Sequence, residues 1–404
     1  MAGRGAVSLS VSHPFDLRRA GQDRLLVPSA STRVPFVDLA RAAAVLFMVQ
    51  GHVLQVLLAP QYSGGVFAEV WLYLRGLTSC TFLMLSGFSF SLATTRRWSE
   101  FQVPGRRVIR RLGRYLLLLA LGYGMRFPAR SISGLSTIST AQWQTFAVVD
   151  VLQLIAVVLT LLQVGVWLLR TPGKFMIWSF AAAVAVVILT PVVSRLALAQ
   201  GLPVFLGAYL TSGGGSIFPA LPWAAYVFFG AGLGVWYARP KRVGQAPDHT
   251  VVFLTAGFGM VALGMLLHVV PWSPFGAVDF WTLSPNLFLV KAGSVLVGLS
   301  AAMRLMRGVK SMPGVVTALS RESLLVYLVH VVLLYGSAWT VGLNQSVGAR
   351  LGPGSVVEWI GLLVVAMSLL AWTWYECKRQ MSSVATLVRA VAAVVVIYGL
   401  VWQV

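Results

Sequence analysis

Five ionisable side chains fall inside apolar runs of the sequence, where a charge is costly unless it is paired or hydrated. Imidazole can act as a base or a nucleophile near neutral pH, and a carboxylate can orient it. A nearby cation can stabilise a developing oxyanion. Together these residue types suit general base catalysis or covalent group transfer. The five are His52, Arg75, Asp150, Lys291 and His330, and the polar Gln50, Gln55, Gln153 and Asn286 accompany them.

The most informative spacing lies in the first apolar run. Asp38 and Arg41 are three residues apart and would share one face of a helix. His52 follows Arg41 by eleven residues, which is roughly 16 Å and three turns further along a helix. One helix would then carry a cation at its entrance and a titratable imidazole deep in the apolar region. A reaction between a phosphate-bearing donor and a deeply placed reacting group needs this arrangement.

The composition places these residues in a membrane protein. Hydrophobic residues make up 58% of the 404 positions, charged residues 10%, and the mean hydropathy is +0.81. A soluble domain carries about a quarter of its residues as Asp, Glu, Lys and Arg. The charged residues of this chain are too few to cover a water-exposed globule.

The apolar runs predict an all-α fold of about eleven transmembrane helices, because about 20 apolar residues span the hydrocarbon core as a helix. Residues 1–33 lack an apolar run after the early arginine and are expected to form a disordered basic tail without a signal peptide. Residues 34–404 are expected to form one transmembrane domain. The predicted spans are 37–59, 67–93, 107–125, 145–169, 174–198, 217–237, 251–270, 284–304, 318–338, 355–375 and 385–403.

Lysine and arginine alternate from one connection to the next. They gather in the tail, in the connection after the second span, and in every second connection after it. Because basic loops stay on the cytoplasmic side, the N-terminus is expected in the cytoplasm and the C-terminus outside the cell membrane. This placement explains the net charge of +20 without a nucleic-acid partner, which is not expected.

With this orientation the five ionisable residues share one depth, in the outer half of the membrane. One polar layer on five helices predicts a buried, hydrated cavity that opens outwards. Plainer explanations stay open for each residue. Asp150 could pair with Lys291 or Arg75 to hold helices together, and these two cations could also extend to the interface. Either histidine could simply hydrogen-bond to a neighbouring helix.

Metal and disulfide chemistry is not expected. The histidines show no pair at metal-ligand spacing, so no metal is predicted. Cys80 and Cys377 are too few for a disulfide framework and are expected to be small buried hydrophobic residues.

Two outer connections look structured. Residues 199–216 mix apolar residues with a glycine run and predict a short re-entrant or interfacial element. Residues 271–283 combine prolines with aromatic residues, which fit an aromatic belt or the wall of a substrate entrance. The aromatic residues are Trp272, Phe275, Phe280 and Trp281.

An arginine, ten intervening residues and a histidine in the first span are shared by two types of membrane acyltransferase. These are the acyltransferase-3 type and the heparan-α-glucosaminide N-acetyltransferase type, and the chain resembles the second more closely. The resemblance covers roughly residues 33–338. The blocks that carry it, in order, are FVDLARAAAVLFMVQGH, FLMLSGFSFSLATTRR, VVDVLQLIAVVL, FPALPWAAYVFFGAGLG, SPNLFLVKAG and SRESLLVYLVH.

The resemblance implies a transmembrane acyltransferase with His52 as the catalytic histidine. It implies an acyl-coenzyme A donor, by default acetyl-coenzyme A, that enters from the cytoplasm. The acceptor would be a hydroxyl or an amine of an extracytoplasmic glycan or glycolipid. In this reading His52 is a general base or is transiently acylated, and Asp150 orients it or the acceptor. Lys291 or Arg75 would stabilise the oxyanion.

The basic connection offers candidates for the coenzyme phosphates, because guanidinium groups bind phosphate bidentately. A purely topological role for these arginines stays open. The donor-binding candidates are Arg41, Arg106, Arg107, Arg110 and Arg111, and the substrate-binding candidates are Arg75, Gln153, Asn286 and His330.

A secondary transporter or a flippase for lipids or glycolipids is the alternative function, because it would also need a buried polar cavity. Transporters often show internal repeats and broken helices. The halves of this chain show no convincing repeat, and the polar residues cluster at one depth, so an acyltransferase is favoured. The sequence leaves open the acceptor, an amide or an ester product, the length of the acyl chain, an acylated His52 and a homodimer.

Overall fold

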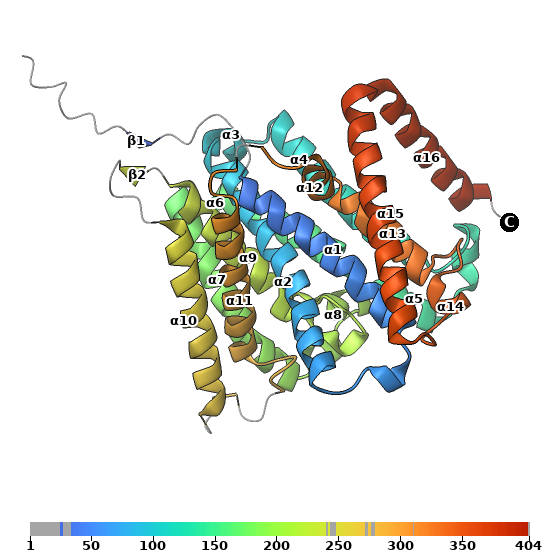
Figure 1. The fold of residues 1–404 in the computed structure, drawn as a ribbon, viewed down its shortest axis with the longest axis horizontal. Helices are drawn as coiled ribbons and strands as arrows, with labels where there is room; N and C mark the ends of the chain where they lie inside the picture. The colour runs from blue at the N-terminus through green and yellow to red at the C-terminus, as the bar shows by residue number, and fades with distance from the viewer. Residues whose placement is uncertain are drawn as a thin grey trace, which may run out of the picture.

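The computed structural model describes residues 25–26, 34–239, 241–242, 248–270, 274–275, 279–309 and 311–402. These residues are almost entirely helical, and Figure 1 shows the long helices side by side, with α10 at one edge and α16 at the other. The one sheet among the described residues is a two-residue antiparallel pair, β1 (Leu25–Leu26) with β2 (Lys241–Arg242). The rest of the predicted tail, 1–24 and 27–33, lies outside the described residues.

Nine of the described helices are long and apolar enough to span a membrane, so the chain is a multi-pass integral membrane protein. A tenth candidate combines α12 (Gly314–Arg321) with α13 (Ser323–Tyr335), which meet at 72°. The nine are α1 (Pro35–Leu57), α2 (Val66–Thr95), α6 (Val151–Leu169), α7 (Pro172–Arg195), α9 (Ala220–Ala238), α10 (His249–Val269), α11 (Pro285–Leu305), α15 (Pro353–Gln380) and α16 (Ser382–Trp402).

The remaining predicted span is α4 (Arg106–Met125), which is a helix but not among these candidates. Arginines fill its first half and lower its hydropathy. It nevertheless runs antiparallel along the candidate span α6. Arg111 contacts Gln163 near the end of α6, and Arg126 pairs with Asp150 at its start. The predicted helix is therefore confirmed, whereas its role as a membrane span stays a prediction.

One predicted span is wrong at its start. The range 145–169 is interrupted, because α5 (Thr140–Ala147) ends before α6 begins at Val151. Asp150 is the N-cap of α6 and forms a capping box with Gln153. A carboxylate here satisfies backbone N–H groups that have no partner inside the helix. Asp150 therefore stands at a helix end rather than inside a span.

A second predicted span, 318–338, breaks between α12 and α13. Polar residues occupy the break, and the buried carboxylate of Glu322 lies 2.5 Å from the ammonium nitrogen of Lys378 on α15. An ion pair at this point lets the chain turn without leaving a charge unpaired.

The short elements occupy the connections. The connection 199–216 holds short helices, and its re-entrant or interfacial placement stays a prediction. In the connection 271–283, Trp272 lies outside the described residues. The ring of Phe280 packs on the ring of His268, with the two ring centres 4.2 Å apart. Cys80 is buried as expected, while Cys377 is partly exposed, and both are free thiols. The short elements are η1 (Pro60–Tyr62), α3 (Trp98–Gln102), η2 (Ser133–Thr137), η3 (Leu198–Gly201), α8 (Val204–Leu210), η4 (Ser212–Gly214) and α14 (Leu343–Ser346).

Contacts between connections define two ends of the bundle. At the end that we call the basic end, Trp98 Nε1 donates to the carbonyl of Arg170 at 2.9 Å. At the opposite end, which we call the far end, the N–H of Leu351 donates to the carbonyl of Leu57 at 2.9 Å. The chain enters α1 at the basic end. It leaves α16 at the far end, where Leu400 accepts a hydrogen bond from Ile132.

The buried side chains form two clusters. The larger core joins α2, α4, α6, α7, α9 and α11, and the smaller core joins α1, α12, α13 and α15. In the larger core α2 and α9 touch through glycines. A Cβ on Gly87 would lie 1.9 Å from the carbonyl oxygen of Val227, and one on Gly230 would lie 2.0 Å from that of Met84. Only glycine permits this approach, so the larger core is held together at backbone distance.

Candidate active site

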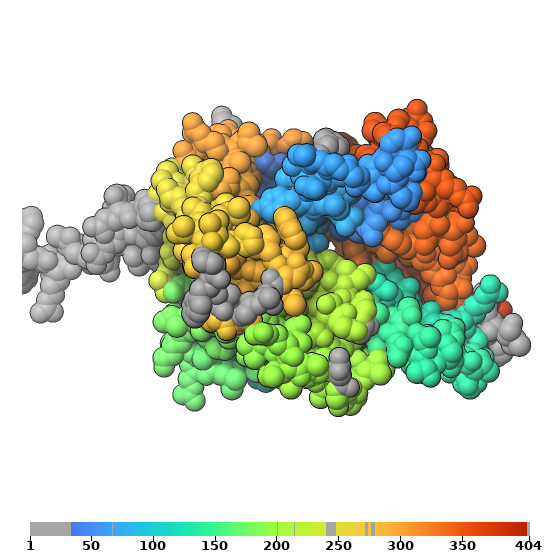
Figure 2. Space-filling model, turned by 90° about the horizontal axis from the view of Figure 1, so that it is seen from below, coloured from blue at the N-terminus to red at the C-terminus, as the bar shows by residue number. Residues whose placement is uncertain are grey.

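A cavity of about 1070 Å³ lies between the two cores. Helices α1 and α13 of the smaller core and α2, α4, α6 and the start of α9 of the larger core line it. Its lining extends from Arg41 and Ser86, towards the basic end, to Gln142 and Ser337 at the far end. Figure 2 shows the far end, where the molecule is hollowed between α2 in blue and the teal segment around α5.

Two histidines from distant parts of the chain meet at this cavity. His52 lines it, and the fully buried His330 lies behind His52. Nδ1 of His52 is 2.9 Å from Nε2 of His330, and the two rings meet edge to edge, with their planes 14° apart and their centroids 5.2 Å apart. The sequence indicates both residues but not their pairing, and it predicts that His330 contacts the substrate. The structure instead places His330 against His52, away from the cavity surface.

The partners of His330 fix where the protons lie in the neutral pair. Nδ1 of His330 is 2.6 Å from the carbonyl oxygen of Val326, and a carbonyl can only accept. His330 therefore carries its proton on Nδ1 and offers the lone pair of Nε2 to His52. His52 must then donate from Nδ1. Its Nε2 is left with a lone pair that can take a proton or attack an electrophile.

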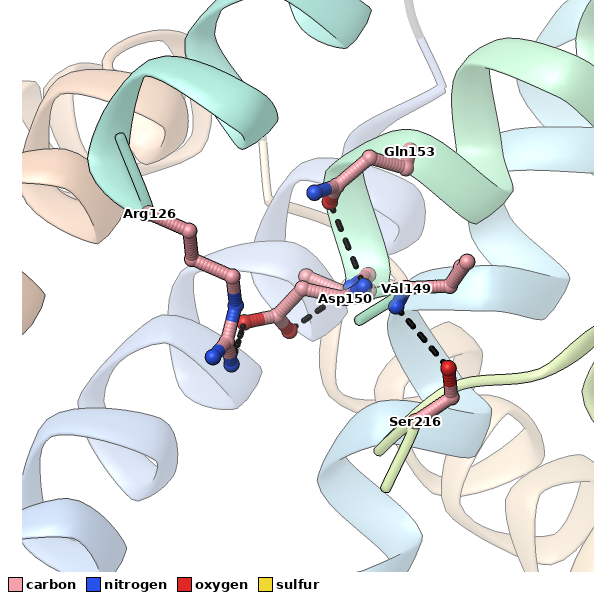
Figure 3. A network of polar contacts seen from close by, with 6 residues as sticks. Arg126, Val149, Asp150, Gln153 and Ser216 are labelled. Atoms are coloured by element: carbon pink, nitrogen blue, oxygen red, sulfur yellow. Dashed lines mark hydrogen bonds and ion pairs between the residues drawn. The ribbon is translucent and has the colours of Figure 1, made fainter. Parts of the chain in front are cut away.

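Asp150 lies on the other side of the cavity, in the network drawn in Figure 3. One carboxylate oxygen accepts from the backbone N–H of Val151 at 2.7 Å, and the other from Nη2 of Arg126 at 3.1 Å. A pairing of this carboxylate with Lys291 or Arg75 is one of the alternatives that the sequence leaves open. The structure assigns that place to Arg126, which also lines the cavity. A hint was present in the sequence, since Arg126 lies in a connection that is otherwise poor in basic residues.

Gln153 supports Asp150 and does not line the cavity. Its side-chain oxygen accepts from the backbone N–H of Asp150 at 3.3 Å, as Figure 3 shows. The network continues to Val149, whose N–H donates to the hydroxyl of Ser216 at 3.0 Å. These bonds hold the start of α6 in place beside the cavity.

Arg75 is the cation that reaches the cavity from α2. Its guanidinium donates to the side-chain oxygen of Gln55 at 3.1 Å and lies 5.3 Å from the ring centre of Trp71. The side chain crosses α1 at Gly51, where a Cβ would lie 2.9 Å from Cγ of Arg75. Gly51 precedes His52, so Arg75 passes next to the histidine. No carboxylate pairs with Arg75 among the described residues, and its charge is available to a ligand.

Lys291 and Asn286 stand further back on α11, and neither lines the cavity. The ammonium nitrogen of Lys291 is 5.8 Å from the ring centre of Trp223, which does line it. The backbone N–H of Asn286 donates to the hydroxyl of Ser284, the N-cap of α11. The structure therefore brings His52, Arg75 and Asp150 to one cavity but leaves these two residues behind its wall.

The donor-binding candidates separate into different environments. Arg41 lines the cavity and donates to the hydroxyl of Ser89 at 2.9 Å. Arg107 pairs with Glu100, and Arg106 and Arg110 are exposed. Arg114 was not selected from the sequence. It is exposed as well, and it precedes the cavity-lining Leu118 by four residues, so the two share one face of α4.

Arg111 serves the fold. Its guanidinium donates to the hydroxyl of Thr94 at 2.9 Å and to the side-chain oxygen of Gln163 at 3.0 Å. It also lies 3.6 Å from the ring centre of Phe101. These contacts join α2, α3, α4 and α6, and they leave this arginine turned away from the cavity.

The described residues hold no group of three or more His, Cys, Asp or Glu side chains that could bind a metal ion. The absence of a metal stays a prediction.

Comparison with known proteins identifies the family. The family described as heparan-alpha-glucosaminide N-acetyltransferase, catalytic, matches residues 33–271, which is more than half of the chain. The match covers α1 to α10 and thus includes His52, Arg75, Arg126 and Asp150, while Lys291 and His330 lie beyond it. Searches of curated proteins and of solved structures returned no match. The chain belongs to the heparan-alpha-glucosaminide N-acetyltransferase catalytic family.

Proposed function

We propose that this protein moves an acetyl group from cytoplasmic acetyl-coenzyme A to a hydroxyl or amine of an extracytoplasmic glycan or glycolipid. The observation that carries the proposal is the unprotonated Nε2 of His52 on a cavity that extends from the basic end towards the far end. Membership of an acetyltransferase family supports the reaction type and the donor. The basic end would face the cytoplasm, by the positive-inside rule, and the cell membrane is the proposed location.

In the proposed reaction the amine nitrogen or hydroxyl oxygen of the acceptor attacks the thioester carbonyl. Nε2 of His52 removes the proton from that nitrogen or oxygen. The new bond forms to the acetyl carbon, and the carbonyl electrons move to the oxygen. Arg75 stabilises this oxyanion, because its guanidinium reaches the same cavity without a carboxylate partner. When the oxyanion collapses, the carbon–sulfur bond breaks. The proton passes from His52 to the departing thiolate, so the histidine returns to its starting state.

Asp150 would orient the acceptor. Arg126 and the start of α6 hold its carboxylate in one position, so it can accept a hydrogen bond from a hydroxyl or amine with little loss of side-chain freedom. Lys291 has no direct role in the proposed reaction, because its ammonium group lies behind Trp223 and does not line the cavity. Asn286 and Gln153 do not line the cavity, so we assign the acceptor site to Arg75 and Asp150.

Arg41, Arg110 and Arg114 are the proposed site for the coenzyme phosphates. Arg114→Ala is expected to raise the KM for acetyl-coenzyme A roughly tenfold, because a charged hydrogen bond contributes about 1.5–3 kcal/mol. The turnover number should change little, because Arg114 does not line the cavity that His52 lines. Steady-state kinetics with purified protein would measure both constants.

Two other arginines are controls for this measurement. Arg195→Ala removes an exposed arginine from the other end of the bundle and should leave the KM unchanged. Arg111→Ala should lower the thermal unfolding temperature, since it breaks bonds between four helices. An equal rise in KM for Arg114→Ala and Arg195→Ala would contradict the donor site.

The proposed function is tested with purified protein in sealed vesicles, acetyl-labelled acetyl-coenzyme A outside and methyl glucosaminide inside. Wild-type protein is expected to release free coenzyme A outside and to form labelled acetylated sugar inside. If labelled donor or sugar instead crosses the membrane unchanged, the cavity is a transport path. If neither transfer nor transport occurs with any amine or hydroxyl acceptor, the acetyltransferase proposal fails.

A further inference from the structure

One buried tyrosine lies between the two cores. Tyr327 of α13 is only 7% exposed, yet among the buried side chains that the structure describes it joins neither the larger nor the smaller cluster. It lines the cavity instead. A buried phenol usually has a hydrogen-bond partner, because burying a hydroxyl without one is costly. The partner of Tyr327 comes from the opposite core.

Tyr327 touches both halves of the active site. It precedes His330 by three residues, and the two rings pack edge to face with their centres 5.8 Å apart. On its other side, its side chain hydrogen-bonds to Asp150, the N-cap of α6. A carboxylate only accepts, so the phenol donates. The carboxylate thereby receives three donors, namely the N–H of Val151, the guanidinium of Arg126 and this hydroxyl.

The chain after α13 reaches the larger core a second time, at the far end. The ring of Trp339 stacks on the ring of Phe127, with their centres 6.2 Å apart and their planes 8° apart. Its Nε1 donates to the carbonyl of Arg130 at 2.8 Å. Phe127 directly follows Arg126, which pairs with Asp150. Trp339 therefore ties the end of α13 to the segment that holds this carboxylate.

These contacts determine how far apart the base and the carboxylate lie. His52 stands on a helix of the smaller core and Asp150 on a helix of the larger one. Transfer needs the reacting atoms within about 3–3.5 Å of each other, so this separation must be held. Tyr327 holds it from both sides, with its ring on His330 and its hydroxyl on the carboxylate. A carboxylate has about four acceptor positions, which leaves one for the acceptor molecule.

We infer that Tyr327 is a positioning residue that fixes Asp150 opposite the histidine pair, so that an acceptor held by the carboxylate meets Nε2 of His52. Trp339 gives the same two segments a second fixed point further towards the far end. This inference rests on the proposed acetyl transfer and adds to it the contact that brings its two halves into register.

Tyr327→Phe removes the hydroxyl and keeps the ring on His330. We expect the KM for methyl glucosaminide to rise about tenfold, because a hydrogen bond to a charged group is lost. The KM for acetyl-coenzyme A should stay near the wild-type value, and a purely structural role would not separate the two constants. Tyr115→Phe is the matched control, since Tyr115 is also buried but does not line the cavity. It should keep both constants.

A double-mutant cycle tests whether Tyr327 acts through the carboxylate. Asp150→Asn keeps a side chain that can cap α6 but removes the charge. If Tyr327 works by holding Asp150, then adding Tyr327→Phe to Asp150→Asn should change the acceptor KM less than about twofold. Effects of the two substitutions that simply multiply would make Tyr327 independent of the carboxylate, and the inference would be wrong.

Nuclear magnetic resonance of the resting protein provides a measurement that needs no turnover. With ¹³C at the tyrosine Cζ, the signal that disappears in Tyr327→Phe belongs to Tyr327. Asp150→Asn should shift this signal, because an amide oxygen accepts a weaker hydrogen bond than a carboxylate. Asp248→Asn should leave it in place, since Asp248 is the exposed N-cap of α10 and pairs with Arg307.

The outcomes separate this inference from the proposed function. If the wild type transfers acetyl groups but Tyr327→Phe keeps both wild-type constants, the positioning role is wrong and the acetyltransferase stands. If the wild type acetylates no acceptor, the reaction is in question, and the resonance alone decides the contact between Tyr327 and Asp150. A Tyr327 signal that does not respond to Asp150→Asn would overturn it.

Discussion

His52→Ala should abolish most acetyl transfer, with kcat lower by about 10²–10⁴-fold, the usual contribution of a positioned general base. The reason is geometric. Nε2 of His52 is the unprotonated imidazole nitrogen on the cavity, because the nitrogen behind it donates to His330. Alanine removes that lone pair and leaves the acceptor proton without a base. The measurement is the turnover of labelled acetyl-coenzyme A with a saturating amino-sugar acceptor.

Two controls make the result specific. His268→Ala removes a histidine that packs on Phe280 away from the cavity, and it should keep wild-type turnover. Binding of acetyl-coenzyme A to His52→Ala should persist, because the proposed phosphate site is built from arginines. Turnover by His52→Ala within threefold of wild type would remove this histidine from the mechanism. Label that stays on wild-type protein after denaturation, but not on His52→Ala, would identify an acetylated histidine in place of a base.

His330→Phe is the second large effect that we expect. Phenylalanine keeps an aromatic ring behind His52 but accepts no hydrogen bond, so His52 is free to carry its proton on Nε2. We expect kcat to fall by about 10²-fold or more, because a base held in the wrong tautomer loses most of its activity. The KM for acetyl-coenzyme A should stay near the wild-type value, since His330 does not line the cavity.

His330→Gln is the conservative partner of this variant. Its side-chain oxygen can accept from Nδ1 of His52, so part of the turnover should return. The ¹⁵N chemical shifts of His52 report its tautomer directly. They should show a protonated Nδ1 in wild type and in His330→Gln, and a mixture in His330→Phe. If His330→Phe kept both the turnover and the Nδ1–H signal, His330 would be only a packing residue.

The long helices could be predicted from apolar length, and α4 is a helix as predicted, although it is not among the candidate spans. The breaks inside the predicted spans 145–169 and 318–338 could not be predicted in this way. Residues 145–169 read as one apolar run, although the capping box of Asp150 and Gln153 was visible as an acidic residue followed three positions later by glutamine. A signal for the end of a helix is short, and hydropathy averaged over a whole span conceals it.

Depth in the membrane could also be predicted, but rotation about each helix axis could not. His52 and Lys291 were assigned to the same layer, yet one lines the cavity and the other lies behind Trp223. The histidine pair joins residues 278 positions apart, and nothing local in either helix specifies that contact. The pairing of Asp150 with Arg126 could not be predicted either, since Arg126 lies in a connection outside the apolar runs and no local pattern links it to the start of α6.

Motion between the two cores would leave the histidine pair intact. His52 and His330 both stand on helices of the smaller core, whereas Asp150, Arg126 and Arg114 belong to helices of the larger one. If the two cores rock against each other, the imidazole pair travels as a unit and keeps its proton arrangement. Only the gap between the base and its substrates then widens or narrows. The protein can then release products and admit new substrates without breaking the hydrogen bond between His52 and His330.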